Sequence, residues 1–214
     1  MNDELRLDPR RTVALTIDMQ RSYLDPSVGG KALPAAEARA VVDAACRLLE
    51  ECRAVGVPVL HAYVQRTDIE TKARIGMRRF TKSFKDVTGA GAEGPDRPIG
   101  SPQAELVPAL AREGDVHIRS KKTSDCFYGT ELEMLLGRAL GADTVVLLGI
   151  NTETCVYATT FAASIRGYRP VIAADCVGSH RGADNTWMAL ELLSRTIAWV
   201  VPSADVIAKL RRPA

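Results

Sequence analysis

Several features that would assign a chain to a particular class are missing from this sequence. No stretch approaches the ~18 consecutive apolar residues of a membrane-spanning helix, and the polar, acidic start MNDELRLDPRR lacks the apolar core of a secretory signal. The formal net charge is only +2 and the basic residues form no long run, so the charge pattern does not point to nucleic acid. We therefore expect a cytoplasmic protein that binds neither membranes nor nucleic acid.

Patterns typical of disulfide frameworks, metal sites and cofactor loops are also missing. The five cysteines include no C-x-x-C pair and are odd in number. Of the three histidines, His61 and His117 are interpreted as sheet residues, and none shows paired ligand spacing. The segment 89–94 (GAGAEG) has the spelling of a dinucleotide loop, but it follows no strand and leads into prolines rather than a helix. We expect a reducing compartment, no metal and no cofactor.

What is present is the alternation of an α/β protein. The 214 residues suit a single domain, 1–214, with a core large enough to need no staples. Apolar runs typical of buried strands alternate with apolar residues at helical spacing. Strands are predicted at 13–17, 57–64, 116–119, 144–148, 170–174 and 197–201, and helices at about 34–56, 103–112, 129–140, 154–166, 184–194 and after residue 202. The alternation predicts a doubly wound, Rossmann-like parallel sheet with helices on both faces.

The alternation breaks down between about residues 65 and 100. This stretch holds many glycines, prolines and charges but little periodicity. An irregular insert of that length in an α/β domain is more often functional than idle. We expect it to cover the site or to make a subunit contact, and we expect the chain to form a homo-oligomer, either a dimer or a tetramer.

Side chains of complementary chemistry follow three of the predicted strands. Asp18 follows the first strand, Lys121 and Lys122 follow the third, and Cys155 lies at the start of the helix after the strand 144–148. Ligands of open parallel sheets bind at the carboxyl ends of the strands. A carboxylate, an ammonium and a thiol are therefore predicted to meet at one edge of the sheet.

Cys155 carries the chemical interpretation. A cysteine in the first turn of a helix lies at the positive end of the helix dipole, which favours the thiolate, and the free N–H groups there can bind an oxyanion. An arbitrary cysteine more often packs like a small hydrophobe, and Cys46 and Cys52 keep that interpretation. In the catalytic interpretation, Asp18 takes the thiol proton and hands it to a leaving amine, while Lys121 stabilises both anions.

Further residues are candidates to line the substrate site. The insert is rich in basic residues, among them Arg66, Arg78 and Arg79, and a guanidinium suits a two-point grip on a carboxylate. A small amide substrate that also bears a carboxylate is therefore one expectation; the alternative is that these charges are solvated or pair across a subunit interface. The other candidates are Gln20, Tyr23, Phe127 and His180.

Three segments in the right order resemble the isochorismatase-like cysteine hydrolases. They are ALTIDMQ around Asp18, KKTSDCFYGTEL from Lys121, and GINTETCVYATTFAASIRGY around Cys155. The resemblance covers about residues 11–205. It implies a catalytic triad of Asp18, Lys121 and Cys155 on a six-stranded parallel sheet.

The resemblance also implies details of the site that the spacing alone does not. Lys121, rather than Lys122, corresponds to the family lysine. A non-proline cis peptide bond is implied between Ile150 and Asn151. The oxyanion hole would then consist of the backbone N–H groups of Asn151 and Cys155.

Departures from particular subgroups narrow the activity. Nicotinamidases of this family carry an Asp-x-His pattern and a further histidine as a metal site, and the residues after Val64 contain no such histidines. Isochorismatases proper, which cleave a vinyl ether, lack the nucleophilic cysteine. The resemblance thus implies a metal-free amidohydrolase that releases ammonia from a small amide or ureido compound through a thioester acyl-enzyme. The alternatives are a vinyl-ether type hydrolase on the same scaffold and a non-catalytic protein that uses Cys155 for thiol sensing or binding.

Overall fold

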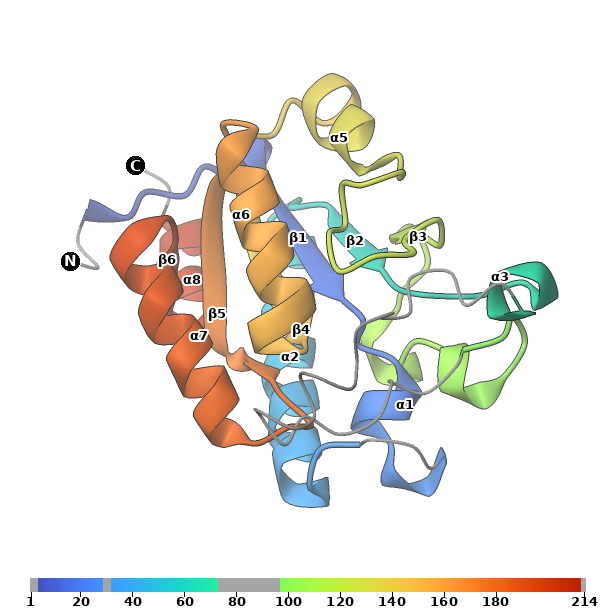
Figure 1. The fold of residues 1–214 in the computed structure, drawn as a ribbon. Helices are drawn as coiled ribbons and strands as arrows, with labels where there is room; N and C mark the ends of the chain where they lie inside the picture. The colour runs from blue at the N-terminus through green and yellow to red at the C-terminus, as the bar shows by residue number, and fades with distance from the viewer. Residues whose placement is uncertain (1–3, 29–31, 73–96, 213–214) are drawn as a thin grey trace.

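The computed structural model describes residues 4–28, 32–72 and 97–212. Its centre is a six-stranded sheet in the order β3-β2-β1-β4-β5-β6, and every neighbouring pair of strands is parallel. The strands are β1 (Thr12–Ile17), β2 (Val59–Ala62), β3 (Val116–Ile118), β4 (Thr144–Ile150), β5 (Arg169–Gly178) and β6 (Trp199–Val201). This confirms the predicted doubly wound parallel sheet (Figure 1).

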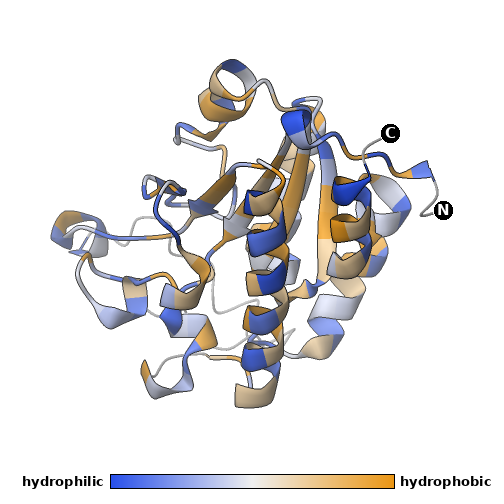
Figure 2. Cartoon of the chain, turned by 180° about the vertical axis from the view of Figure 1, so that it is seen from behind, coloured by the Kyte–Doolittle hydropathy of each residue, from blue (hydrophilic) through white to orange (hydrophobic). Residues whose placement is uncertain are grey.

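The helices form a layer on each face of the sheet. One face is covered by α2 (Ala35–Ala54) and α8 (Ser203–Arg211), and the other by α5 (Leu132–Met134), α6 (Tyr157–Ile165) and α7 (Ala183–Thr196) (Figure 1). Successive side chains of a strand point to opposite faces, so Ala14 packs in the core under α2 while Val13 and Leu15 pack in the core on the other face. Figure 2 shows the apolar strands enclosed between helices whose outer faces are more polar. No helix of the described segments is long and apolar enough to cross a membrane.

The two central strands are buried on both faces, as their continuous apolar sequences predict. Every residue of β1 and of β4 is buried, and the two strands pair from Thr12 opposite Thr144 to Ile17 opposite Gly149. The strand order runs outward in opposite directions from this pair. Ligands of such sheets bind where the order reverses, beyond the carboxyl ends of the strands, so the fold places the expected site beside the ends of β1 and β4.

The prediction of a helix at 103–112 is wrong. The chain forms two short 3₁₀ turns instead, Pro102–Ala104 and Pro108–Leu110. The residues between them are extended, because Leu106 makes an antiparallel bridge to Gln20 and the N–H of Val107 donates to the Met19 carbonyl. Each proline starts a turn but cannot continue a helix that needs its N–H group.

The residues at the two ends of the irregular insert, which form its two stems, are hydrogen-bonded to each other. The backbone N–H of Arg66 donates to the Arg97 carbonyl at 2.8 Å, and that of Ile99 donates to the Arg66 carbonyl at 2.9 Å. A short helix, α3 (Asp68–Lys72), follows the first stem. Residues 73–96 lie outside the described part of the chain, so the covering role expected of the insert stays a prediction.

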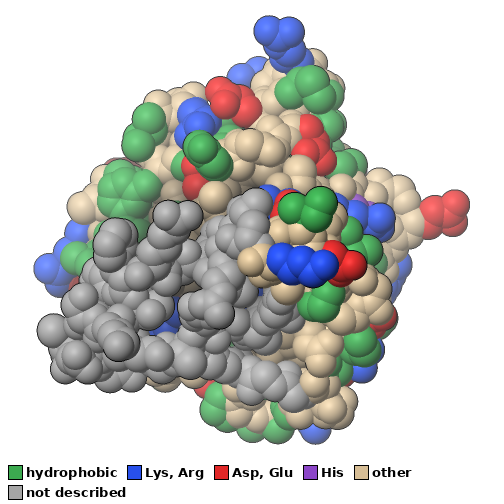
Figure 3. Space-filling view, turned by 45° about the vertical axis from the view of Figure 1, so that its right-hand side comes forward, with side chains coloured by type: hydrophobic (Ala, Val, Ile, Leu, Met, Phe, Trp, Pro, Cys, Tyr) green, Lys and Arg blue, Asp and Glu red, His purple; other side chains and the backbone are tan. Residues whose placement is uncertain are grey.

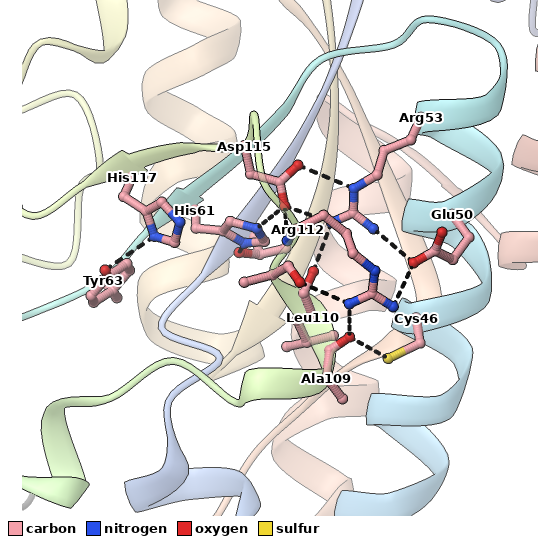
Figure 4. Close-up of polar contacts among 12 residues, drawn as sticks. Cys46, Glu50, Arg53, His61, Tyr63, Ala109, Leu110, Arg112, Asp115 and His117 are labelled. Carbon is pink, nitrogen blue, oxygen red and sulfur yellow. Dashed lines mark hydrogen bonds and ion pairs between the residues drawn. The ribbon is translucent and has the colours of Figure 1, made fainter.

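A buried polar cluster joins β2 to α2 and to Asp115, the residue before β3 (Figure 4). The Nε2 atom of His61 lies 3.1 Å from Asp115 Oδ2, and its Nδ1 atom lies 2.7 Å from the Thr16 hydroxyl. A carboxylate only accepts hydrogen bonds, so Nε2 carries the proton and Nδ1 accepts from Thr16. Asp115 also binds Arg53 of α2 at 2.7 Å. His61 and His117 lie in β2 and β3, which confirms their interpretation as sheet residues.

This cluster predicts a pH dependence of stability. Burial lowers the pKa of His61 to about 4, although Asp115 opposes the shift. The unfolded chain, with a histidine pKa near 6.5, binds the proton first, so stability is present above about pH 6.5 and is lost as the pH falls toward 4. We expect the free energy of unfolding to drop by about 2 kcal/mol more between pH 7 and pH 5 in the wild type than in His61→Gln. Urea denaturation at both pH values measures this; identical drops in the two proteins would contradict it.

Candidate active site

The three side chains predicted to meet at the sheet edge do meet. Asp18 directly follows β1, Lys121 follows β3, and Cys155 follows β4. The ammonium nitrogen of Lys121 lies 2.6 Å from Asp18 Oδ2 and 3.6 Å from the sulfur of Cys155. One cation therefore contacts both the carboxylate and the thiol.

The backbone around Asp18 is held in an uncommon conformation. Asp18 has a φ of +50°, its N–H donates to the Ala62 carbonyl at 2.8 Å, and its carbonyl accepts from the N–H of Gln20 at 2.7 Å. Next to it, β4 approaches β1 so closely that a Cβ on Gly149 would lie 2.1 Å from the Ile17 carbonyl oxygen. Only glycine fits there, which brings the end of β4 against Ile17, the residue directly before Asp18.

Only one of the two carboxylate oxygens of Asp18 has a hydrogen-bond partner among the described residues. Its Oδ2 atom binds Lys121, whereas its buried Oδ1 atom has no hydrogen-bond partner among the described residues. A buried acceptor without a partner is costly and is rare in native proteins. Oδ1 is thus the oxygen available to accept a proton.

Lys121 is fully buried, and it differs from its neighbour in the sequence. Burial, the largest single effect, lowers the pKa of Lys121. The charge and hydrogen bond of Asp18, together with the nearby Cys155 and Cys126, outweigh burial and raise that pKa above its usual range, so the ammonium form is kept. Lys122 is partly exposed; its ammonium donates to the Gln65 carbonyl and to Glu70 Oε2, the latter at 3.1 Å. Lys122 therefore contacts α3, through Glu70, whereas Lys121 contacts the thiol.

Cys155 lies in a π-helical turn, Thr152–Val156, that leads into α6. The carbonyl of Asn151 accepts hydrogen bonds from the N–H groups of Thr154 and Val156, both at 3.2 Å. In an α-helix the N–H of Cys155 would donate to this carbonyl instead. The expected cis peptide bond between Ile150 and Asn151 is present. The backbone N–H of Asn151 has no protein acceptor within the described segments.

The helix position of Cys155 favours the thiolate, but the burial of its sulfur opposes ionisation. Burial raises its pKa to about 11; Lys121 lowers it in part, and Asp18 raises it further. Although some surface of the residue is exposed, the sulfur lies deep enough for desolvation to outweigh the ammonium. Attack by the sulfur therefore requires a base that removes the proton at the same time.

Two of the substrate-site candidates, Tyr23 and His180, form a wall with Asn151. The rings of Tyr23 and His180 are stacked with centroids 5.6 Å apart. The backbone N–H and the Nδ1 atom of His180 lie 3.0 and 2.8 Å from Asn151 Oδ1. Burial raises the pKa of Tyr23, and the charges of Asp18 and Cys155 contribute to that rise, so this wall lies near the thiol.

Two residues at the site were not predicted from the sequence. The guanidinium of Arg97 lies 4.4 Å from the centre of the Tyr23 ring and donates to the Ser22 hydroxyl at 3.0 Å. Arg97 lies near the end of the irregular insert, where no periodicity in the sequence distinguishes it from the other arginines. Ser124 is exposed, and its hydroxyl lowers the pKa of the Cys155 thiol through a hydrogen bond. Its position on the loop that begins at Lys121 was the available signal.

Gln20 and Phe127 make contacts that account for them as packing residues. The side-chain amide of Gln20 donates to the carbonyls of Val64 and Ala104, both at 2.8 Å, and ties two loops to the end of β1. Phe127 is buried in the core and stacks on Tyr168 with ring centroids 5.8 Å apart. A contact of either residue with substrate stays a prediction.

The arginines expected to bind a carboxylate are only partly visible. Arg66 is buried, and its backbone joins the stems of the insert. Arg78 and Arg79 lie outside the described residues. On the face drawn in Figure 3, the basic side chains that are coloured lie dispersed among acidic and apolar ones. The described residues contain no group of three or more His, Cys, Asp or Glu side chains that could hold a metal ion; independence from metal stays a prediction.

The thiols should differ in their reaction with iodoacetamide. Cys155 is partly exposed, whereas Cys52, Cys126 and Cys176 are fully buried, and burial raises the pKa of the first two of these to about 12. We expect mass spectrometry to find Cys155 labelled first, at a rate that rises roughly tenfold per pH unit between pH 7 and 9 because only the thiolate reacts. The rate is measured in a Cys46→Ser variant, so that Cys46, the other partly exposed thiol, does not contribute to the labelling. A rate that is already constant above pH 7 would contradict the raised pKa.

Comparisons with known proteins place the chain in a family. The isochorismatase domain model matches residues 12–205. Maleamate amidohydrolase of Pseudomonas putida is 29% identical over 202 residues, which cover 94% of this chain and 88% of that protein; phenazine biosynthesis protein PhzD1 of Pseudomonas aeruginosa is 30% identical over 203 residues, with coverages of 94% and 87%.

Solved structures share the fold. A cysteine hydrolase from Pseudomonas syringae superposes with a TM-score of 0.78 at 22% identity, covering 97% of this chain and 96% of the other. N-carbamoylsarcosine amidase from Thermoplasma acidophilum superposes with a TM-score of 0.66 at 24% identity, with coverages of 90% and 96%. The chain belongs to the isochorismatase-like hydrolase family.

Proposed function

We propose that the protein is a cofactor-free amidohydrolase that cleaves the C–N bond of a small amide or ureido compound through a thioester on Cys155. The observation that carries this proposal is the single buried ammonium of Lys121, which contacts both Asp18 and the thiol. A fully buried charge is costly and is kept where it is paired. The names of two similar proteins, maleamate amidohydrolase and N-carbamoylsarcosine amidase, support the choice of an amide.

The first step forms the acyl-enzyme. Asp18 Oδ1, which has no other partner among the described residues, accepts the thiol proton as the sulfur of Cys155 attacks the carbonyl carbon. A C–S bond forms and the carbonyl oxygen becomes an oxyanion, which the N–H groups of Asn151 and Cys155 stabilise. The Lys121 ammonium contacts both Asp18 and the sulfur, so it stabilises the negative charge that these groups carry in the dry interior.

The second half releases both products. The tetrahedral intermediate collapses as the C–N bond breaks, and Asp18 gives its proton to the leaving nitrogen, so that ammonia departs. A water molecule then attacks the thioester while Asp18 takes its proton. The C–S bond breaks, the acid is released, and the proton returns to the sulfur of Cys155.

Each part of the triad should be needed for ammonia release. We expect Cys155→Ala to abolish ammonia release over a panel of small amides. Asp18→Asn should lower it by at least ~10²-fold, the effect of losing a general acid–base group. Lys121→Ala should lower it comparably, because the cation that contacts both the carboxylate and the thiol is lost. Lys122→Ala is the matched control and should lose much less, because Lys122 contacts Gln65 and Glu70 instead.

The same assay separates the alternatives. Ammonia release that survives Cys155→Ala would contradict the thioester mechanism and favour a hydrolase without a nucleophilic thiol. No ammonia from any amide, together with a reversible modification of Cys155, would favour a thiol-sensing protein. Equal losses at Lys121→Ala and Lys122→Ala would contradict the assignment of the lysines.

We further propose that the substrate bears a carboxylate near its amide, as in a ureido acid or the half-amide of a dicarboxylic acid. Among the described residues, the buried cation stacked on the wall of Tyr23 and His180 is Arg97. A cation in such a low-dielectric position attracts an anion strongly.

A comparison of substrates tests this proposal. We expect the wild type to hydrolyse an acid-bearing amide better than its methyl ester, and Arg97→Met to lower kcat/KM for the acid by ~10-fold or more, as expected for losing a hydrogen bond between charged groups. The ester should be affected much less. Arg138→Met removes an exposed arginine and serves as the control. A preference for the ester that Arg97→Met leaves unchanged would contradict the carboxylate.

A further inference from the structure

Asn151 is held at two of its polar groups. Its backbone carbonyl accepts hydrogen bonds from the N–H groups of Thr154 and Val156, and its side-chain oxygen accepts from His180. With the carbonyl and the side chain both anchored, the direction of the remaining backbone N–H is determined. That N–H has no acceptor in the described part of the chain, and the residue is almost fully buried.

His180 makes the side-chain anchor with two donors. Its backbone N–H and its Nδ1 atom lie 3.0 and 2.8 Å from the same oxygen, Asn151 Oδ1. An amide oxygen only accepts, so Nδ1 carries a hydrogen in this arrangement. The backbone donor would survive a change of side chain, whereas the Nδ1 donor would not.

The imidazole ring is itself fixed in orientation. Its plane is tilted by 20° from the ring plane of Tyr23. Tyr23 is buried and lies in α1 (Arg21–Leu24), the short helix that follows the segment carrying Asp18. The Arg97 guanidinium covers the same tyrosine. The wall therefore connects the segment after β1 to the nucleophile turn after β4, and His180 is the member that touches Asn151.

We propose that His180 is a positioning residue that aims the backbone N–H of Asn151 at the oxyanion of the tetrahedral intermediate. The inference rests on the proposed amidohydrolase function and adds a residue to it. A misdirected donor loses most of its value where charge develops, because the site cannot reorganise during the reaction. The loss falls on the transition state rather than on bound substrate, and so on kcat rather than KM.

The test compares two replacements of His180. The amide nitrogen of asparagine is the same number of bonds from Cα as Nδ1 of histidine, so His180→Asn keeps a donor in place, whereas His180→Ala removes it. The probe is the amide from which the wild type releases ammonia fastest. We expect His180→Ala to lower kcat by ~10-fold or more with little change in KM, and His180→Asn to keep kcat within about threefold of wild type.

Alkylation of Cys155 by iodoacetamide is measured in the same proteins. This displacement passes through no oxyanion, so its rate should be equal in the wild type and both variants, which also shows that the triad is intact. His117→Ala, which removes a histidine that contacts Tyr63, is the matched control and should keep the wild-type kcat.

Three results would overturn the inference: an unchanged kcat in His180→Ala, a kcat in His180→Asn as low as in His180→Ala, or a raised KM with an unchanged kcat, which would make His180 a substrate contact. Failure of the proposed function looks different. It would show in the wild type itself, as no ammonia release from any amide or as ammonia release that survives Cys155→Ala, and the inference would fall with it.

Discussion

The structure of the site depends on one interaction, the contact of the buried Lys121 ammonium with Asp18 and Cys155. An ammonium in a dry interior is tolerated only when a carboxylate is close, and here the separation from Asp18 Oδ2 is 2.6 Å. The sheet meets this requirement because β1 and β4 are neighbours and β3 ends on the same edge. Gly149 removes the side chain that would otherwise separate β4 from the backbone before Asp18.

Two buried polar clusters in this fold have different characters. In the cluster of Figure 4, His61 is bonded at both ring nitrogens, and Asp115 accepts from His61 and Arg53. Such a satisfied network joins a helix to the sheet, and burial keeps the histidine neutral against the opposing effect of Asp115. At the candidate site, by contrast, Asp18 Oδ1 and the N–H of Asn151 have no partner within the described segments. The unpaired groups are a base and an oxyanion donor, which is what acyl transfer to Cys155 requires.

Two features of the structure were not captured by the sequence, each for an identifiable physical reason. The helix expected at 103–112 carried the right apolar pattern, but Pro102 and Pro108 limit it to short turns, and the extended residues between them pair with the segment after β1. For Cys155, the sequence indicated two groups that favour the thiolate, the start of a helix and the ammonium of Lys121. Desolvation is the larger effect and raises the pKa of the thiol to about 11. No pattern in the sequence shows how far this particular sulfur lies from solvent.

The sequence by itself determined the order of strands and helices, because continuous apolar runs and helical spacing report local burial, and it determined which residues follow each strand. It therefore indicated Asp18, Lys121 and Cys155 together, since parallel strands end at one edge. The resemblance to a known family already favoured Lys121 over Lys122, and the structure shows the contact of Lys121 with the thiol. Only the tertiary structure decided that Arg97 stacks on Tyr23 and that His180 anchors Asn151. These contacts join residues between 29 and about 75 positions apart in the chain, and their geometry depends on packing between elements, which no local pattern encodes.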